Sequence, residues 1–381
     1  MTGESPVRRV TRFDASEFAC GIAVEVDGFR PFEPEDRRLT RLDRFSQFAV
    51  RAAHSALLDA RLEPHDLSHE TAVYVGSALG GIAFAEEQHE RYLASGIRSV
   101  APGLALSVFA GAAATNICIA FGLHGPAISN ANSCASGAVA IGEAFKLVQT
   151  GRVDIALAGG VETPLAPLTF GSFALIRAMS RRNNCPAEAC RPFDLHRDGF
   201  VMGEGAALLV LEERERALER GARLYGEMIG YASTNDAHHM TAPLPDGREA
   251  ARAMELALLD ARLTPPDVGY INAHATGTSL GDAAEAAAIR SVFGEDTPPV
   301  SSTKPLHGHA LGASAAIEAA VTILALHRAF LPNTRNLGAV DPTCALNHVP
   351  SGGRHGAVPV ALSNSFGFGG INAALVLAGD G

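Results

Sequence analysis

Cys134 is the residue whose surroundings in the sequence best suit nucleophilic chemistry. It lies in the segment Ala-Asn-Ser-Cys-Ala-Ser-Gly at residues 131–137. Asn132 and Ser133 are good helix-capping residues, and the small residues after Cys134 predict the first turn of a helix. A thiol attacks only as a thiolate, and the free N–H groups at a helix N-terminus lower the pKa of a cysteine. The pattern predicts a nucleophile, with a small buried hydrophobic residue as the alternative.

Three later segments contain groups that can assist such a nucleophile. His274 follows an apolar run, in Asn-Ala-His-Ala-Thr-Gly-Thr, and Lys304 and His309 precede a helix that carries Glu318. Glycines in Ser-Asn-Ser-Phe-Gly-Phe-Gly-Gly, residues 363–370, allow backbone N–H groups to face a cavity. Each segment alone is ambiguous, since a histidine at the end of a strand is more often structural. Together the four segments are expected at the ends of strands, which is where α/β proteins bind their ligands.

The other cysteines do not suggest chemistry. Six cysteines are too few and too scattered for a disulfide framework. Cys118 lies in an apolar helical run and is expected in the core. Cys185 and Cys190 have no partner pair, whereas zinc requires four ligands, so no metal site is expected. These features favour a reduced, cytoplasmic protein.

The elements that must position these groups alternate between strand and helix. Apolar runs predict strands at residues 71–75, 154–158, 206–211, 224–231, 268–273 and 358–363. Periodic, Ala-rich segments predict helices at residues 45–60, 136–149, 214–220, 248–261, 282–292 and 314–328. Such alternation predicts an α/β fold whose sheets are covered by helices on both faces.

Composition narrows the class of protein. A chain of 381 residues with 47% hydrophobic residues suits one large unit or two domains. The formal net charge of −10 argues against a general nucleic-acid binder. No apolar run is long enough to span a membrane, and the first residues show no signal-peptide pattern. An arginine cluster at positions 37, 38, 41 and 44 is expected, from charge patterning alone, to be a solvated helix face.

The four motifs, in this order, resemble those of the β-ketoacyl-[acyl carrier protein] synthases: Asn-Ser-Cys-Ala-Ser-Gly, Asn-Ala-His-Ala-Thr-Gly-Thr, Ser-Thr-Lys with Gly-His-Ala-Leu-Gly-Ala, and Asn-Ser-Phe-Gly-Phe-Gly-Gly. The similarity covers nearly the whole chain and is closest to the type II elongating enzymes of fatty-acid synthesis. It implies a thiolase-like fold of two related βαβ halves, packed as α-β-α-β-α layers. Residues 1–221 would carry the nucleophile, and residues 222–381 the remaining catalytic groups and the Gly-rich loop.

The resemblance also implies a reaction. Cys134 would accept an acyl chain from the phosphopantetheine arm of a carrier protein, and malonyl-carrier protein would then lose CO₂ and attack the thioester. His274 and His309 would donate Nε2–H to the enolate oxygen, while Lys304 and Glu318 form a supporting ion pair. Backbone N–H groups of Cys134 and Phe366 would hold the acyl oxyanion. No metal or organic cofactor is implied.

Four residues would contact the substrate. Thr276 and Thr278 match threonines that hydrogen-bond the pantetheine amides in the family. Phe366 matches a gate that swings when the acyl chain arrives, and Phe368 lies beside it on the same loop. The glycines between and after them would supply the hinge freedom.

Carrier-protein docking, dimerisation and chain length are further implications. Arg37 and Arg41 match basic positions that would bind an acidic carrier protein. Residues 107–121 match a part that lines the partner subunit's acyl pocket in the family's dimer. Phe109 stands there in place of a smaller aliphatic residue, which predicts a shorter acyl chain. A homodimer is expected, with a heterodimer containing a ketosynthase-like subunit as the alternative.

The sequence also departs from the family. An opening strand and helix are absent before Val10, and that strand is expected to be central to the first sheet. Either the start codon is misassigned or a shortened chain has impaired activity. His307 is an additional imidazole where the family has a smaller polar residue.

The competing functions are a polyketide-type ketosynthase and a catalytically silent partner subunit. A Gly-Thr pair followed by Gly-Asp, at residues 277–282, favours the polyketide branch. The presence of Cys134 with both histidines argues against a silent subunit. A thiolase is disfavoured because thiolases pair one histidine with a second cysteine.

Overall fold

The computed structural model describes residues 4–29 and 38–380. In chain order its strands are β1 (Arg8–Arg9), β2 (Ile22–Ala23), β3 (Ala72–Gly76), β4 (Ala127–Asn130), β5 (Ile155–Glu162), β6 (Gly205–Glu212), β7 (Gly226–Asn235), β8 (Tyr270–Asn272), β9 (Val300–Ser301), β10 (Phe330–Leu331), β11 (Arg354–His355), β12 (Val360–Gly367) and β13 (Ile371–Gly379). Its α-helices are α1 (Arg44–Ala60), α2 (Ile82–Ser95), α3 (Leu104–Ser107), α4 (Ala112–Phe121), α5 (Ser136–Gln149), α6 (Pro167–Leu175), α7 (Arg214–Glu219), α8 (Arg248–Asp260), α9 (Ser279–Phe293) and α10 (Ser314–His327). None of these helices is long and apolar enough to cross a membrane.

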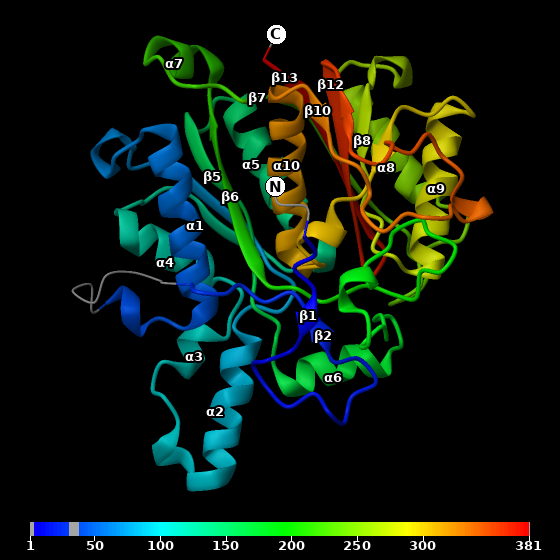
Figure 1. The fold of residues 1–381 in the computed structure, drawn as a ribbon. Helices are drawn as coiled ribbons and strands as arrows, with labels where there is room; N and C mark the ends of the chain where they lie inside the picture. Colours follow the sequence, from blue (N-terminus) through cyan, green and yellow to red (C-terminus); the bar gives the residue numbers. More distant parts are fainter. Residues whose placement is uncertain (1–3, 30–37, 381) are drawn as a thin grey trace.

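Two mixed sheets organise the chain (Figure 1). The first has the order β4-β3-β5-β6, and the second has the order β7-β13-β12-β8-β9. In the first sheet, β3 is parallel to β4 and β5, and β6 returns antiparallel to β5. In the second, β8 is parallel to β9 and β12, and β13 returns antiparallel to β12. The two sheets therefore share one topology, as expected for related halves.

Helices cover both faces of each sheet and fill the space between the sheets. α1 and α4 pack on the outer face of the first sheet, and α8 and α9 pack on the outer face of the second. α5 and α10 lie between the sheets, where both contribute to one core cluster with strands from each sheet. The predicted α-β-α-β-α layering is confirmed, and the predicted division at residue 221 falls between α7 and β7.

The central helices pack closely because small residues line their contacts. A Cβ atom added at Gly137 would lie 2.9 Å from the backbone nitrogen of Ala316 in α10. One added at Gly142 would overlap the ring of Tyr231 at 2.2 Å. The glycine-rich start of α5 is therefore what lets the nucleophile's helix approach the other half of the molecule.

The prediction that a central strand is absent from the first sheet is wrong about its position. Strands β3, β4, β5 and β6 correspond in order and direction to β8, β9, β12 and β13. Only β7 has no counterpart among the described residues, and β7 lies at the edge of its sheet, beside β13. The first sheet is therefore continuous through its centre, and the difference between the halves is confined to the edge formed by β6.

Candidate active site

Cys134 lies in a tight turn between β4 and α5. After β4, Ser133 adopts a left-handed conformation with φ of 51°, and a 3₁₀ turn, Ser133–Ala135, leads into α5. The expected capping by Asn132 is not made, because its side chain forms no capping hydrogen bond. Asn130 holds the turn instead, donating from Nδ2 to the carbonyl of Ser136 at 3.1 Å and accepting from the N–H of Asn132 at 3.3 Å. The turn leaves the thiol facing a cavity, with Cys134 only 7% exposed.

Burial, rather than the helix terminus, dominates the ionisation of this thiol. Burial raises the pKa of Cys134 to about 11, although a hydrogen bond with Ser133, the positive charge of Lys304 and the backbone N–H of Phe368 each act to lower it. The predicted lowering of this pKa is therefore wrong, because desolvation opposes the charged form more strongly than the nearby dipoles favour it. The thiol needs a proton acceptor to become a nucleophile.

His309 is placed to be that acceptor. Its Nε2 lies 3.1 Å from the sulfur of Cys134, and its Nδ1 lies 3.0 Å from the hydroxyl of Ser314. Burial, followed by the positive charge of Lys304, holds the pKa of His309 well below its usual value, so the ring is neutral at pH 7. A hydroxyl can donate or accept, so Ser314 supports either tautomer of this ring.

His274 completes the pair of imidazoles, its ring centroid lying 5.4 Å from that of His309. Lys304 Nζ lies 3.4 Å from His274 Nδ1 and also forms a buried ion pair with Glu318. Burial and then Lys304 keep the pKa of His274 well below its usual value. Because the ammonium can only donate to Nδ1, the single ring proton of His274 resides on Nε2. The predicted Lys304–Glu318 pair is present and fixes this tautomer.

Three buried carboxylates that were not predicted as site residues hold the backbone around these groups. Glu285 accepts from the N–H groups of His274 and Ala275 at 2.9 and 2.7 Å, and Asp282 accepts from Thr276 and Gly277, both at 3.1 Å. Their spacing of one helical turn predicts a structural role for Asp282 and Glu285, and these hydrogen bonds to the backbone agree with that prediction.

Glu162, at the end of β5, is the third of these carboxylates. It accepts from the N–H groups of Ala78, Leu79 and Gly312 at 2.7, 3.1 and 3.0 Å, and from the hydroxyl of Ser77 at 3.0 Å. Burial raises the pKa of Glu162 to about 7, against the lowering effect of these donors. One side chain thus ties the loop after β3 to the turn before α10.

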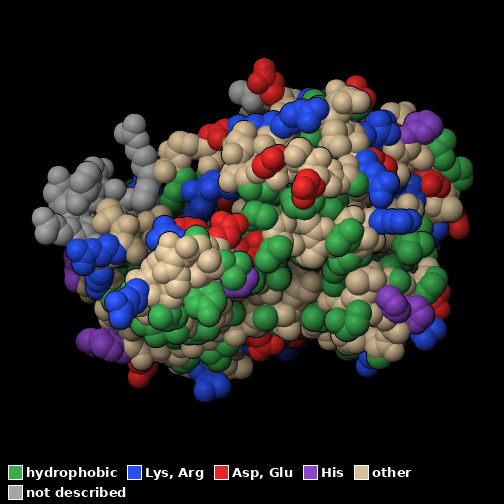
Figure 2. All heavy atoms as spheres, turned by 90° about the horizontal axis from the view of Figure 1, so that it is seen from below, with side chains coloured by type: hydrophobic (Ala, Val, Ile, Leu, Met, Phe, Trp, Pro, Cys, Tyr) green, Lys and Arg blue, Asp and Glu red, His purple; other side chains and the backbone are tan. Residues whose placement is uncertain are grey.

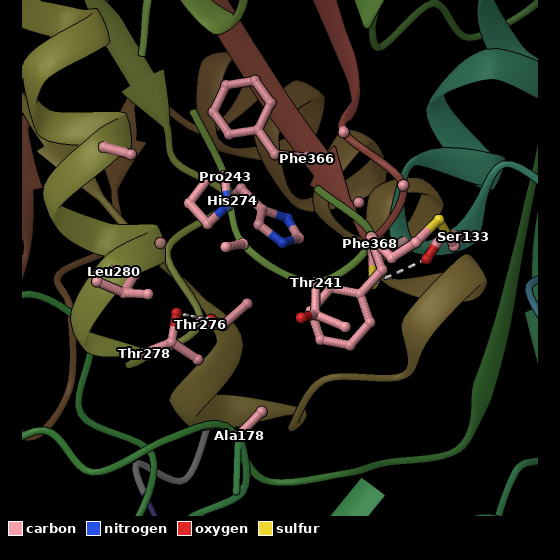
Figure 3. Close-up of a pocket in the computed structure, with 18 of the residues that line it drawn as sticks. Ser133, Ala178, Thr241, Pro243, His274, Thr276, Thr278, Leu280, Phe366 and Phe368 are labelled. Atoms are coloured by element: carbon pink, nitrogen blue, oxygen red, sulfur yellow. Dashed lines mark hydrogen bonds between the residues drawn. The ribbon is translucent and has the colours of Figure 1, made fainter. Parts of the chain in front are cut away.

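The two phenylalanines of the Gly-rich loop have different positions from those predicted (Figure 3). Phe366 still belongs to β12, where it pairs with Asn372, and its ring centroid lies 6.0 Å from that of His274. Phe368 lies in the turn, and its ring stacks on that of Phe173 with the centroids 6.2 Å apart. Its backbone N–H acts to lower the pKa of the Cys134 thiol, whereas that of Phe366 does not, so Phe368 is the residue taken up below as the proposed second oxyanion donor.

A cavity of about 450 Å³ brings these groups together. It is lined by the sulfur-bearing turn, both imidazoles, both phenylalanines and two threonines: Cys134, His274, His309, Phe366, Phe368, Thr276 and Thr278. The hydroxyls of Thr276 and Thr278 lie 3.1 Å apart at one wall of the cavity (Figure 3). Lys304 and Glu318 are fully buried and do not line the cavity. Within the described ranges, no group of three or more His, Cys, Asp or Glu side chains is arranged to hold a metal ion.

Arg41 and Phe109, predicted to act in docking and in chain-length selection, do not line the cavity of the single chain. Arg41 is exposed in a 3₁₀ turn, Leu39–Arg41, and Arg37 lies outside the described residues. Arg44, in contrast, turns inward and donates to Glu204 at 2.9 and 2.7 Å. Phe109 is 47% exposed and covers Gly111, so its predicted role concerns only a pocket completed by another subunit.

Comparison with known proteins agrees with the geometry. The family profile of the β-ketoacyl synthase N-terminal domain matches residues 8–217, and that of the C-terminal domain matches residues 225–338. The chain is 45% identical over 379 residues to 3-oxoacyl-[acyl-carrier-protein] synthase 2 of Synechocystis sp., covering 98% of this chain and 91% of that protein. It is 40% identical over 380 residues to the protein of the same name from Staphylococcus aureus, covering 99% and 92%.

Solved structures of ketosynthases also superimpose on the whole chain. A β-ketoacyl synthase from Burkholderia phymatum superimposes with a TM-score of 0.92 at 37% identity, covering 99% of this chain and 93% of that one. A type II polyketide ketosynthase, in complex with its acyl-carrier protein, superimposes with a TM-score of 0.92 at 34% identity, covering 100% and 93%. Both family profiles, whole-length relatives and the shared fold confirm the resemblance in the motifs, and the chain belongs to the β-ketoacyl synthase family.

Proposed function

We propose that the protein is a 3-oxoacyl-[acyl carrier protein] synthase, which joins a Cys134-bound acyl chain to malonyl-carrier protein with loss of CO₂. The observation that carries this function is the contact of 3.1 Å between the sulfur of Cys134 and Nε2 of His309, with His274 in the same cavity. This set serves both halves of a decarboxylative condensation, namely transfer of an acyl group to sulfur and stabilisation of an enolate.

In the first half-reaction, Cys134 passes its proton to Nε2 of His309 as the sulfur attacks the acyl thioester. The new C–S bond replaces the bond to the pantetheine sulfur, which leaves as a thiol after recovering the proton from His309. The backbone N–H groups of Cys134 and Phe368 are proposed to hold the oxyanion of the tetrahedral intermediate. Such donors typically contribute about 3 kcal/mol each to the transition state.

In the second half-reaction, the malonyl thioester loses CO₂ and leaves an enolate. His274 donates Nε2–H to the enolate oxygen, because Lys304 occupies its Nδ1. His309 donates from Nε2 in its other tautomer, with the hydroxyl of Ser314 turned to donate to Nδ1. The enolate carbon then attacks the carbonyl carbon of the Cys134 thioester, and the C–S bond to Cys134 breaks. The β-ketoacyl product leaves on the carrier protein, and the released thiolate takes up one proton from water. These steps balance without a redox change, so we propose that no resident metal or organic cofactor takes part.

Intact-mass measurement and product analysis test this function directly. Incubation with an acyl-carrier protein should add one acyl group per chain at Cys134, and subsequent addition of malonyl-carrier protein should remove it and release CO₂. Absence of the acyl adduct on the folded protein, or CO₂ release without a β-ketoacyl product, would contradict the proposal.

A polyketide-type ketosynthase is the second candidate, because polyketide ketosynthases also superimpose over the whole chain. The two candidates differ in how the product is treated after condensation, since repeated extension without reduction would yield a poly-β-ketone. Incubation with excess malonyl-carrier protein and no reductase separates them. One round of extension supports the fatty-acid type, and several rounds support the polyketide type.

Carrier-protein docking at Arg41 and Arg37 remains a proposal. Both charges would attract an acidic carrier protein without touching the reacting atoms. Reversal of both charges should raise KM for carrier-bound substrates and leave reaction with a free acyl thioester unchanged. Reversal of Arg252, an exposed arginine on α8 in the other half, is the matched control. Equal losses with both kinds of substrate would exclude docking as the explanation.

A homodimer is proposed from the exposed apolar residues on the face that carries α2 and α6 (Figure 2). Large hydrophobic side chains that are more than 60% exposed on these helices or beside them are Leu93, Ile97, Leu106, Leu168 and Leu175. Exposed apolar side chains that gather on one face mark interaction sites in soluble proteins. Light scattering of the purified protein should give twice the chain mass of 39.6 kDa. A heterodimer would instead require a second, related chain.

Phe109 belongs to the same proposal, because an acyl pocket completed by the second subunit would bring its ring near the acyl chain. Phe109→Ala should then extend the accepted acyl length, whereas Ile119→Ala, at another exposed apolar position of the same region, should not.

All six cysteines are free, which supports action in a reducing compartment such as the cytoplasm.

A further inference from the structure

His307 is a third imidazole close to the catalytic histidines, and it does not line the cavity. It follows the 3₁₀ turn Lys304–Leu306 and precedes Gly308, whose positive φ of 69° turns the chain toward His309. The side chain of His307 is 16% exposed. Its Nε2 lies 3.1 Å from the hydroxyl of Thr303 and 4.0 Å from Oε1 of Glu318.

Glu318 and His307 each have one buried polar atom without a hydrogen-bond partner among the described residues, Oε2 and Nδ1. The carboxylate of Glu318 is fully buried, with one oxygen bound to Lys304. The other oxygen, Oε2, has no hydrogen-bond partner among the described residues. A buried carboxylate with an unsatisfied oxygen is costly, so any further donor dipole directed at it stabilises the ionised form. Nε2 of His307 approaches the oxygen that also binds Lys304, lying 4.0 Å from Oε1 of Glu318.

The nearby carboxylate also decides the tautomer of His307. Burial, followed by the charge of Lys304, lowers the pKa of His307 to about 3, so the ring is neutral. A neutral imidazole has one proton, and the negative charge of Glu318 favours its location on Nε2, the nitrogen facing the carboxylate. The hydroxyl of Thr303 then accepts this hydrogen bond and fixes the ring plane. The Nε2–H of His307 is donated to Thr303, and its partial positive charge lies 4.0 Å from Oε1 of Glu318.

We propose that His307 is a positioning residue for the condensation, acting through Glu318 to hold Lys304 against Nδ1 of His274. This inference rests on the proposed function, and it extends that function beyond the groups that touch substrate. The path runs from His307 to Glu318, from Glu318 to Lys304, and from Lys304 to the imidazole that stabilises the enolate. The acyl-transfer step does not run along this path, because His309 contacts both Cys134 and Ser314 directly.

The charges that face Glu318 allow a pH dependence to be derived. Besides Lys304 and His307, these are the thiol of Cys190 and the phenol of Tyr270, and burial raises the pKa of each to about 12, so both are uncharged at pH 7. Burial raises the pKa of Glu318 itself to about 7, although Lys304 acts to lower it. Loss of the His307 dipole raises this pKa further. The rate of decarboxylation should then fall at a higher pH than in the wild type.

The test compares three variants of the full-length protein. His307→Leu removes the donor, His307→Gln keeps an N–H near the position of Nε2, and His307→Asn places it nearer the backbone. Two rates are measured from pH 5.5 to 8.5: acylation of Cys134 by an acyl-carrier protein, and CO₂ release from malonyl-carrier protein. His307→Leu should slow CO₂ release about tenfold at pH 7 and raise the pH at which this rate falls on the acid side of its profile. The rate of Cys134 acylation should stay within about twofold of the wild-type rate.

Rescue by His307→Gln but not by His307→Asn is the expected companion result. Equal slowing of both rates, an unshifted acid limb, or equal behaviour of the Gln and Asn variants would overturn the inference. If His307→Leu does not fold, the Gln and Asn pair decides the question alone. Failure of the wild-type protein to acylate or to release CO₂ would instead contradict the proposed function, so the two failures are distinguishable.

Discussion

The two halves of the molecule contain the same turn before their central helices, but only one of the turns has a reactive side chain. In the first half, Asn132 has φ and ψ of −83° and 41°, and Ser133 has a positive φ of 51°. In the second, Ala310 has −84° and 38°, and Leu311 has a positive φ of 40°. The next residue is Cys134 in the first turn and Gly312 in the second.

The same backbone turn therefore has a different role in each half of the molecule. Cys134 directs a thiol into the cavity, whereas Gly312 uses its N–H to bind Glu162 at 3.0 Å. A Cβ atom at Gly312 would lie 2.6 Å from the backbone nitrogen of Ala78 and 2.8 Å from the carboxylate of Glu162. The second turn therefore aligns the loops around the site, and the first supplies the chemistry.

The largest expected effect comes from making the first turn chemically like the second. Cys134→Ala should reduce condensation by at least about 10³-fold, because no covalent acyl intermediate can form. His274 and Lys304 do not depend on the thiol, so CO₂ release from malonyl-carrier protein should persist. Measurement of acyl adduct, product and CO₂ in parallel separates these steps. Product formation by this variant near the wild-type rate would mean that the first turn does not supply the nucleophile.

The reciprocal change adds a side chain to the second turn. Gly312→Ala should lower the free energy of unfolding by about 1–3 kcal/mol, because its Cβ has no space beside Ala78 and Glu162. Urea denaturation measures this loss. Gly103→Ala is the matched control, since no atom lies within 4 Å of the added Cβ there. Equal stability of the two variants would show that the second turn tolerates a side chain.

The pH dependence of alkylation tests how the first turn activates its thiol. Because burial raises the pKa of Cys134 to about 11, the thiolate fraction rises steadily through neutral pH. Alkylation of Cys134 by iodoacetamide, followed on its own peptide, should increase about tenfold per pH unit between pH 7 and 9. A rate that is flat over this range would indicate a pKa lowered by the helix terminus, and burial would then not be the dominant effect.

The smallest expected difference concerns the edges of the two sheets. β13 lies between β12 and β7, whereas β6 has β5 as its only paired neighbour within the described ranges. Hydrogen exchange at amides of β6 that face away from β5 should be about tenfold or more faster than at amides of β13. The same protection at both strands would show that the outer edge of β6 is covered in solution.

Much of this arrangement could be predicted from the sequence. The helix at residues 136–149 was predicted with the bounds that α5 has, and the motifs identified Cys134, His274 and His309, which share one cavity. β13 was missed because it directly follows the Gly-rich loop and was not separated from it.

Other features depend on three-dimensional surroundings and were not accessible from the motifs. Phe366 and Phe368 are two residues apart in a symmetric Phe-Gly-Phe pattern, and only the end of β12 distinguishes them. The raised pKa of Cys134 reflects its burial in the folded chain. The role of Glu162 arises from donors 83 to 150 residues away in the sequence.

The close approach of α5 to α10 at Gly137 brings together groups that neither half of the chain contains alone. The thiol belongs to the first half, whereas both imidazoles and the ammonium belong to the second, so neither half contains a complete set. A fragment comprising one half would hold a nucleophile without an acceptor for its proton, or an acceptor without a nucleophile. On the proposed mechanism the catalytic unit is the interface between the halves, and any change that strengthens or loosens their association would also change the rate of the reaction.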